Sequence, residues 1–456
     1  MLIDGCEYFS ELEAALRRAV RSIVIVGWDF DGGVRLRPQG GAGWDLGPLL
    51  RRLVEARPEL EVRILIWSSA VLHGPSSPQE LLFGSAWQDH PRISLRLDTT
   101  HPIYASHHQK IVCIDSALAF VGGMDITVDR WDTPEHVVDD PRRVCPNGKS
   151  YGPVHDVMLM LDGPAAGAVC ALASKRWKAA TGEEMPAAPG DVEPWPAHRT
   201  ADFTGVRVGL ARSLPAWAAR RRIKEAPRLI EDVLRSARRS LYIEAQYLTA
   251  DHIGHILTER LKAPEGPEIV AVVSDVTHSF LERVIMGANR NRMIRRLRRA
   301  DRHGRLRIYH PMAPGPDGGC PILVHSKLMI ADDQLLRIGS SNLNNRSVGL
   351  DTELEVVIEA AGADDREAIT RLRDRLLGEH LGVPAERLAE VVAETGSLIA
   401  AVEQLNVGER RLEPFRAMTK PGALDPIIGS SLLDPTEPFS WAGLWNGLWP
   451  KRPDQT

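Results

Sequence analysis

Two similar stretches decide the fold of this chain: HHQKIVCIDSALAFVGGMD at residues 107–125 and VHSKLMIADDQLLRIGSSN at residues 324–342. Each contains a histidine, a lysine two positions later and an aspartate after four further apolar residues, and each ends in a turn of small residues. The apolar run between the lysine and the aspartate is typical of a buried strand. Side chains two residues apart on a strand share a face, so each histidine is expected beside its lysine.

The similarity extends outward from these stretches and keeps its order along the chain. LRRAVRSIVIVGWDF at residues 16–30 matches LRSARRSLYIEAQYL at residues 234–248. EVRILIW (61–67) matches EIVAVVSD (268–275), and RISLRLD (92–98) matches RLRIYHP (305–311). Because these apolar and β-branched runs alternate with helical segments, the repeat predicts an α/β fold in which each half is a mixed sheet flanked by helices.

The repeat also predicts the domain organisation. We expect a first lobe at residues 1–185, a proline-rich linker at 186–200, a second lobe at 201–383, and a C-terminal helix with a tryptophan-rich tail at 384–456. The tail spaces Trp441, Trp445 and Trp449 four residues apart. Those side chains would share one side of a helix, either packed on the protein's own surface or anchored in a lipid interface.

Composition limits the candidate functions. The 56 basic and 60 acidic residues give a formal charge of -4, so no positive field covers the whole chain and no nucleic acid partner is expected. Five cysteines without metal-ligand spacing indicate reduced thiols, a cytoplasmic chain and no zinc. No apolar stretch is long enough to span a bilayer, so any membrane contact is expected to be peripheral. We expect a monomer with no metal and no cofactor.

A single His-x-Lys match would usually be a solvated surface strand, but two copies at equivalent repeat positions favour a shared site. The chain resembles the phospholipase D superfamily, whose duplicated motifs meet at a pseudo-twofold lobe interface. The resemblance rests on HSKLMIADD, IGSSNLNNRS and DTELEV in the second half, and on HHQK, FVGGMD, RWDT and His155-Asp156 in the first. The chain has Val154 where that family usually has tryptophan, and Ala245 where it usually has asparagine.

This resemblance implies a phosphodiester cleavage that needs no metal, with a phosphohistidine intermediate. We assign His108 as the nucleophile and His325 as the acid that protonates the leaving alcohol. The paired lysines would neutralise charge on the phosphoryl oxygens, whereas the two motif aspartates are expected to be mainly architectural. The candidate catalytic set is therefore His108, Lys110, Asp115, His325, Lys327 and Asp332.

Further positions are predicted from the repeat and from the resemblance. Alignment of HDVMLML with TELEVVIEA places Asp156 opposite Glu353, so these carboxylates are the candidates to orient the histidines. Ser341 and Asn342 can donate to phosphate oxygens, and Trp131 can either line an acyl or headgroup site or serve as a packing anchor. The candidate phosphate and substrate residues are Gly123, Trp131, His155, Gln246, Ser341 and Asn342.

Three activities compete. A phospholipase D that releases phosphatidic acid from phospholipid at a membrane surface, with water or an alcohol as acceptor, is the leading interpretation. A phosphatidyltransferase of the cardiolipin synthase type is the alternative, although such chains usually carry membrane-spanning helices. A nuclease ranks third, because DNA binding requires a basic groove.

Overall fold

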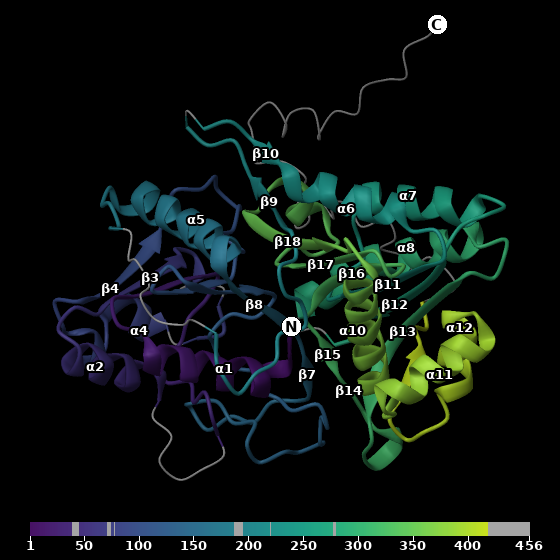
Figure 1. Ribbon diagram of the computed structural model, residues 1–456, viewed down its shortest axis with the longest axis horizontal. Helices are drawn as coiled ribbons and strands as arrows, with labels where there is room; N and C mark the ends of the chain where they lie inside the picture. The colour runs from purple at the N-terminus through teal and green to yellow at the C-terminus, as the bar shows by residue number, and fades with distance from the viewer. Residues whose placement is uncertain are drawn as a thin grey trace, which may run out of the picture.

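The computed structural model describes residues 1–38, 45–70, 74–76, 78–186, 195–218, 220–276 and 280–417. Most of the predicted linker and the tryptophan-rich tail lie outside these residues. The described chain forms two α/β lobes that lie side by side, with the N-terminus between them (Figure 1). No helix among the described residues is both long enough and apolar enough to cross a membrane.

The first lobe is built on a seven-stranded sheet in the order β1-β8-β6-β5-β2-β3-β4. Its strands are β1 (Leu2–Ile3), β2 (Ser22–Gly27), β3 (Glu61–Trp67), β4 (Ile93–Asp98), β5 (Ile111–Ile114), β6 (Leu118–Gly122) and β8 (Val157–Asp162). Its helices are α1 (Asp4–Arg18), α2 (Leu46–Ala56), α4 (Pro78–Phe83), η1 (Ala86–Gln88) and α5 (Gly163–Thr181).

The second lobe is built on a ten-stranded sheet in which β10-β9-β18-β17-β16-β11-β12-β13-β14 form the main path. Its strands are β9 (Val208–Leu214), β10 (Ile223–Lys224), β11 (Ser240–Ala245), β12 (Glu268–Val273), β13 (Leu306–Ala313), β14 (Cys320–Pro321), β16 (Lys327–Ala331), β17 (Leu335–Gly339), β18 (Glu353–Glu359) and β19 (Arg411–Pro414). Its helices are α6 (Glu225–Ser236), α7 (Asp251–Lys262), α8 (Phe280–Ala300), η2 (Pro316–Gly318), α9 (Asn345–Gly349), α10 (Ala363–Leu381), α11 (Ala385–Thr395) and α12 (Leu398–Leu405).

The two sheets repeat one strand order. The path β8-β6-β5-β2-β3-β4 in the first lobe recurs as β18-β17-β16-β11-β12-β13 in the second, and in both the last three strands are parallel while the others pair antiparallel. The strands predicted from the sequence repeat occupy equivalent places in this order. The predicted α/β class and the two-lobe architecture are therefore confirmed.

One hydrophobic core runs through both lobes. It joins the face of the first sheet under α5, which includes Trp177, to the face of the second sheet under α10, which includes Leu372. The outer faces have separate cores beneath α1 and α2 in the first lobe and beneath α6, α7 and α8 in the second. Since the central core is shared, the lobes are held together by buried apolar surface as well as by polar contacts.

Three features differ from expectation or were not foreseen. The last predicted helix breaks at Gly396, whose left-handed backbone (φ 66°) ends α11 before α12 begins. The chain after residue 383 also returns to the second sheet, where β19 pairs with β13. A two-stranded parallel ribbon, β7 (Val154–His155) with β15 (Leu323–Val324), connects the lobes.

The two motif aspartates anchor the chain behind the strands. Asp115 accepts hydrogen bonds from the backbone N–H groups of residues 20, 21 and 22 at 2.7–2.8 Å. Asp332 accepts the equivalent three bonds from residues 238, 239 and 240 at 2.8–2.9 Å. Each aspartate thereby ties the turn after its strand to the start of the neighbouring strand, β2 or β11, as an architectural role requires.

This anchor generates a stability prediction. Asp332→Ala leaves three backbone N–H groups without their charged acceptor, and we expect the free energy of unfolding to fall by about 2–4 kcal/mol. The neighbouring Asp333 forms a surface ion pair with Arg239 and accepts a hydrogen bond from the Gln334 side chain, so Asp333→Ala is the control and is expected to cost less than about 1 kcal/mol. Urea unfolding followed by circular dichroism measures both, and equal losses would contradict the anchoring role.

Candidate active site

Both motif histidines lie just before the strands that were expected to contain them. β16 begins at Lys327, two residues after His325, and β5 begins after the corresponding lysine of the first motif. The backbone N–H of His108 donates to the carbonyl oxygen of Thr352 at 2.9 Å, and that of His325 donates to His155 at 2.8 Å. The expectation that each His-Lys pair lies within a strand is wrong, because hydrogen bonds to the other lobe replace the ladder there.

The side chains of the two histidines are held by carboxylates from the opposite lobe. His108 Nδ1 of the first lobe lies 3.1 Å from Glu353 Oε2 of the second. His325 Nδ1 of the second lobe lies 2.7 Å from Asp156 Oδ2 of the first. The repeat alignment predicted these two carboxylates as the orienting pair, and the structure places them there. The sequence did not indicate that the two bonds cross between the lobes.

These contacts define the chemistry of each ring. A carboxylate that accepts from Nδ1–H makes Nε2 the nitrogen that attacks or transfers a proton. His108 and the Ser340 hydroxyl lower the pKa of Glu353 although its burial opposes this. Burial raises the pKa of Asp156, with Lys327 as the main opposing influence. The two histidines therefore have orienting partners of different acidity.

The two lysines are buried beside the histidines and have different partners. Lys110 Nζ forms an ion pair with Asp125 at 2.9 Å. Lys327 Nζ donates to Gln246 Oε1 at 3.4 Å, so Gln246, predicted as a substrate residue, lies at the second lysine. Both lysine side chains are at most 2% exposed.

The charges around Lys327 show that the two motifs meet. Burial lowers the pKa of Lys327 to about 7, Asp156 opposes this shift, and both Lys110 and Arg130 add to it. Arg130 was not among the predicted site residues, although it opens the RWDT motif. Its proximity to Lys327 and Asp156 makes it a third cation of the site.

Gly123 leaves room for one of the orienting carboxylates. A Cβ atom at this position would lie 2.3 Å from Asp156 Oδ1, which is closer than any real contact. In the second lobe the equivalent position holds Ser340, whose hydroxyl bonds to Glu353. Gly123 was predicted to face the phosphate, and the structure places it against Asp156.

Ser341 and Asn342 follow that turn in the second lobe and are both buried. Among the described residues, Ser341 Oγ and Asn342 Oδ1 have no hydrogen-bond partner. Buried polar atoms without partners are uncommon. A phosphate oxygen could accept from the Ser341 hydroxyl, whereas Asn342 Oδ1 needs a donor such as water. Their contact with a phosphate group stays a prediction.

His155 does not lie where a substrate contact requires. The side chain is fully buried, its Nε2 lies 3.1 Å from Glu244, and its Nδ1 lies 2.9 Å from Glu379 and 3.0 Å from Asp4. Both ring nitrogens face carboxylates, so neither is presented to a phosphate group. The expected substrate role of His155 is therefore corrected to membership of a separate buried cluster.

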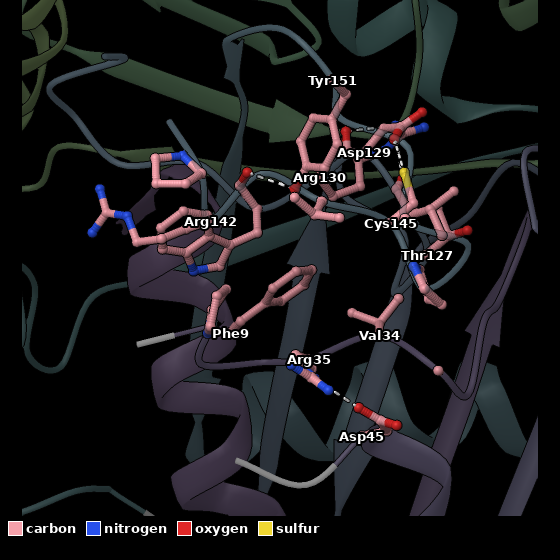
Figure 2. Close-up of a pocket in the computed structure, with 18 residues that line it drawn as sticks. Phe9, Val34, Arg35, Asp45, Thr127, Asp129, Arg130, Arg142, Cys145 and Tyr151 are labelled. Carbon is pink, nitrogen blue, oxygen red and sulfur yellow. Dashed lines mark hydrogen bonds and ion pairs between the residues drawn. The ribbon is translucent and has the colours of Figure 1, made fainter. Parts of the chain in front are cut away.

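Trp131 lines a cavity of about 380 Å³ in the first lobe, formed largely by the loop that follows the first motif (Figure 2). The Arg142 guanidinium lies over its ring at 4.9 Å, and Phe9 and Tyr151 also line the cavity. Arg130 borders the same space. The loop thus forms a cavity beside the active site, and Trp131 both packs against Arg142 and lines the wall.

Family models match both halves of the chain. A model described as "Phospholipase D" matches residues 15–191, and one described as "Cardiolipin synthase, PLD-like domain" matches residues 230–376. Together the two matches contain both histidine motifs.

Several curated proteins are similar over most of the chain. Phospholipase D A of Dictyostelium discoideum is 26% identical over 84% of this chain and 35% of its own length. Phospholipase D1 of Schizosaccharomyces pombe is 22% identical over 85% of this chain and 36% of its own length. Phospholipase D alpha 1 of Ricinus communis is 24% identical over 81% of this chain and 63% of its own. The chain thus spans about a third of the length of the first two.

The fold is also that of a solved structure. Phosphatidylserine synthase of Haemophilus influenzae superposes with a TM-score of 0.52, at 13% identity, covering 87% of this chain and 93% of that chain. This likeness supports the architecture of two lobes.

The close contact at Gly123 yields a prediction about the site. Gly123→Ala forces the Asp156 carboxylate away from His325, so we expect hydrolysis of a soluble aryl phosphodiester to fall at least about 100-fold. A Cβ atom added at Gly152 would meet no other atom within 4 Å, so Gly152→Ala should retain the original rate. Steady-state rates and melting temperatures of both variants test this, and a fully active Gly123→Ala protein would contradict it.

Proposed function

Because this chain belongs to the phospholipase D superfamily, we propose that it is a phospholipase D that cleaves the headgroup phosphodiester of glycerophospholipids and releases phosphatidic acid. The crossed pairs, His108 with Glu353 and His325 with Asp156, carry this proposal. They supply two oriented histidines to one place where Lys110, Lys327 and Arg130 also gather. That set suits a reaction that needs a nucleophile, a proton donor and cations at a phosphoryl group.

The proposed reaction has two steps. His108 Nε2 attacks phosphorus to form a P–N bond, the P–O bond to the headgroup breaks, and His325 gives its proton to the departing alkoxide. His325 then takes a proton from water, whose oxygen attacks phosphorus as the P–N bond breaks. The lowered pKa of Glu353 supports His108 as the nucleophile, because an ionised carboxylate stabilises the positive charge that the ring acquires.

The phosphoryl oxygens would be held by groups from both lobes. Lys110 and Lys327 provide the charge, and the Ser341 hydroxyl, which has no hydrogen-bond partner among the described residues, would donate to a phosphoryl oxygen. Asn342 beside it would donate through its side-chain amide N–H groups. We place the remainder of the lipid toward the cavity that Trp131 lines, since the cavity and the cationic centre share Arg130. The substrate would be reached at a membrane surface by a peripheral protein.

Transfer to an alcohol is the second candidate. The match to a family model described by cardiolipin synthase covers the second motif, and only the acceptor in the second step distinguishes transfer from hydrolysis. A nuclease is disfavoured by the formal charge of -4.

Headgroup release from mixed-phospholipid vesicles, with and without ethanol, tests the function. We expect phosphatidic acid without ethanol and phosphatidylethanol with it. His108→Ala and His325→Ala should each reduce both products at least about 1000-fold, because each removes an essential group of the two-step reaction. His252→Ala, at an exposed histidine paired with Glu231, is the matched control and should be fully active.

The other outcomes separate the alternatives. Formation of cardiolipin from phosphatidylglycerol, with little phosphatidic acid, would favour the transferase. Degradation of DNA while vesicles remain intact would reject a lipid substrate and retain the fold assignment.

The buried Lys327 predicts the pH dependence. Its lowered pKa of about 7 means that the cation is present below that pH and is lost above it. We therefore expect kcat/KM to fall as the pH rises through about 7. Arg130→Gln removes a nearby positive charge, so the variant should be slower yet lose activity at a higher pH. Arg235→Gln, at an exposed residue of α6, should leave the profile unchanged. A profile that stays in place in Arg130→Gln would reject Lys327 as the titrating group.

A further inference from the structure

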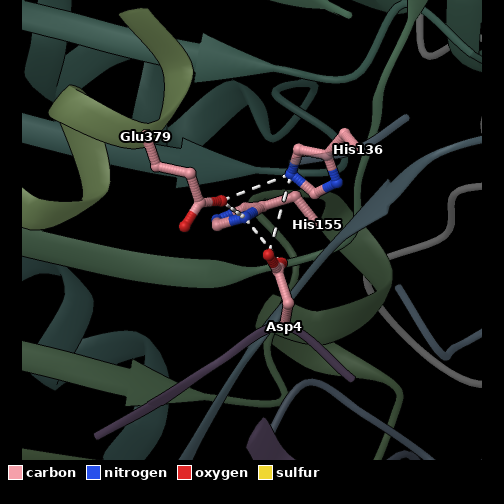
Figure 3. Close-up of side chains that lie close together, drawn as sticks. All are labelled: Asp4, His136, His155 and Glu379. Atoms are coloured by element: carbon pink, nitrogen blue, oxygen red, sulfur yellow. Dashed lines mark hydrogen bonds and ion pairs between the residues drawn. The ribbon is translucent and has the colours of Figure 1, made fainter. Parts of the chain in front are cut away.

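A cluster of histidines and carboxylates lies between the lobes, next to the active site but separate from it. Asp4, His136, His155 and Glu379 point their polar atoms toward one another (Figure 3). We refer to these four residues as the interlobe cluster. They come from the start of α1, the loop after the first motif, β7, and α10 of the second lobe. Their side chains are between 0 and 8% exposed.

The distances within the interlobe cluster match those of a tetrahedral metal site. His155 Nδ1 lies 3.0 Å from Asp4 Oδ1 and 2.9 Å from Glu379 Oε1. His136 Nε2 lies 3.7 Å from Asp4 Oδ2 and 3.3 Å from Glu379 Oε1. Four ligands at zinc bond lengths of about 2.0 Å are separated from one another by about 3.3 Å. The observed separations surround that value.

Each histidine also binds a carboxylate through its other ring nitrogen. His136 Nδ1 lies 2.8 Å from Asp132, and His155 Nε2 lies 3.1 Å from Glu244. Histidines that bind a metal generally make such a contact, which fixes the tautomer and increases the basicity of the coordinating nitrogen. Both histidines of the interlobe cluster therefore present the correct nitrogen to its centre.

The outer carboxylates are themselves held in place. Asp132 binds Arg143 at 2.9 Å and accepts from the backbone N–H of Val154 at 2.9 Å. Glu244 accepts from the Tyr242 hydroxyl and lies 3.1 Å from His380 Nε2. These contacts keep the two carboxylates on the far side of the histidine rings.

Asp4 receives few polar contacts from the rest of the described chain. It is fully buried, and among the described residues neither of its carboxylate oxygens accepts a hydrogen bond. Burial and Glu379 raise its pKa to about 6. Asp4 and His136 also adopt left-handed backbones, with φ of 62° and 43°, which non-glycine residues rarely do. A cation among these side chains would give Asp4 a partner in addition to the two histidines.

We propose that the interlobe cluster binds one divalent cation of the zinc class, as a closed structural site that joins the two lobes. Two imidazole nitrogens and two carboxylate oxygens are ligands that zinc accepts in tetrahedral geometry, and burial leaves no open position for a substrate. The expectation of no zinc rested on the cysteines, and this site uses none of them.

The charges of the buried groups agree with a divalent ion. The carboxylates of Asp4, Glu379, Glu244 and Asp132 carry four negative charges, and the guanidinium groups of Arg143 and Arg410 near them carry two positive charges. Two negative charges remain to be balanced if the histidines are neutral. One divalent cation balances them.

Protonation of both His136 and His155 is the alternative to a bound metal ion. The nearby carboxylates raise the pKa of His136 to about 9 and that of His155 well above its usual value, although burial opposes both shifts. Two imidazolium ions would carry the same total charge as one divalent cation. Charge alone therefore cannot separate the two states, and the experiment must detect the metal directly.

The ion would act on the active site through the chain. His155 directly precedes Asp156, which orients His325, and the backbone carbonyl of His155 accepts from the His325 N–H. Glu379 brings α10 of the second lobe to the same point. The metal would thus hold Asp156 at its distance from His325 without contacting the substrate.

The test is metal analysis of the full chain, purified without a histidine tag from zinc-supplemented cells and dialysed against metal-free buffer. We expect about one zinc ion per chain by mass spectrometry, and visible absorption bands of tetrahedral cobalt after replacement with Co²⁺. Removal of the ion by a chelator in mild denaturant should lower the melting temperature, and added zinc should restore it. A chain that retains no metal, shows no cobalt bands and melts unchanged with added zinc would overturn the proposal in favour of the two protons.

Variants locate the ion. His136→Gln and Glu379→Gln each remove one ligand from a different lobe, and we expect both to reduce the zinc content at least about tenfold. His252→Gln, at an exposed histidine that pairs with Glu231, is the matched control and should keep the ion. Full zinc content in both ligand variants would place the metal elsewhere and overturn the assignment. None of these measurements uses the lipid substrate, so they are independent of the proposed activity.

Discussion

His108 donates to Glu353 and His325 donates to Asp156, and both hydrogen bonds cross the boundary between the lobes in opposite directions. Each histidine is therefore oriented only while the lobes are docked. The shared apolar core, the β7–β15 ribbon and the interlobe cluster all hold that docking in place. A shift of one lobe would change both bonds together, so the orientation of both histidines depends on one interface.

Much of the fold could be predicted from the sequence because the repeat preserved strand character at matching positions. Apolar, β-branched runs such as those of β2 and β11 identify buried strands without further information. The strand β19 is different, because it pairs with β13 only after the chain has formed the four helices α9, α10, α11 and α12. Its short run of residues 411–414 has no periodicity that would distinguish it from a loop.

The residues of the candidate site could be predicted where they lie close together in the sequence or at matching positions of the repeat. The His-x-Lys pairs and the alignment of Asp156 with Glu353 identified residues that the structure brings together. Which lobe serves which histidine depends on docking, which a repeat does not encode. The position of His155 was not predictable for the same reason: it faces Glu244 and Glu379 from the second lobe. Arg130 could have been predicted from its place at the start of the RWDT motif, but of these two neighbours only Trp131 was predicted as a site residue.

The turn after each motif shows how far the two halves have diverged. In the first lobe Gly123, which has no side chain, lies against the shorter carboxylate, Asp156. In the second lobe the hydroxyl of Ser340 bonds to the longer carboxylate, Glu353. After a gene duplication, two identical copies would surround both histidines with the same groups. These paired substitutions break that equivalence. The ancestral symmetry survives in the backbone, while the side chains give the two histidines different surroundings.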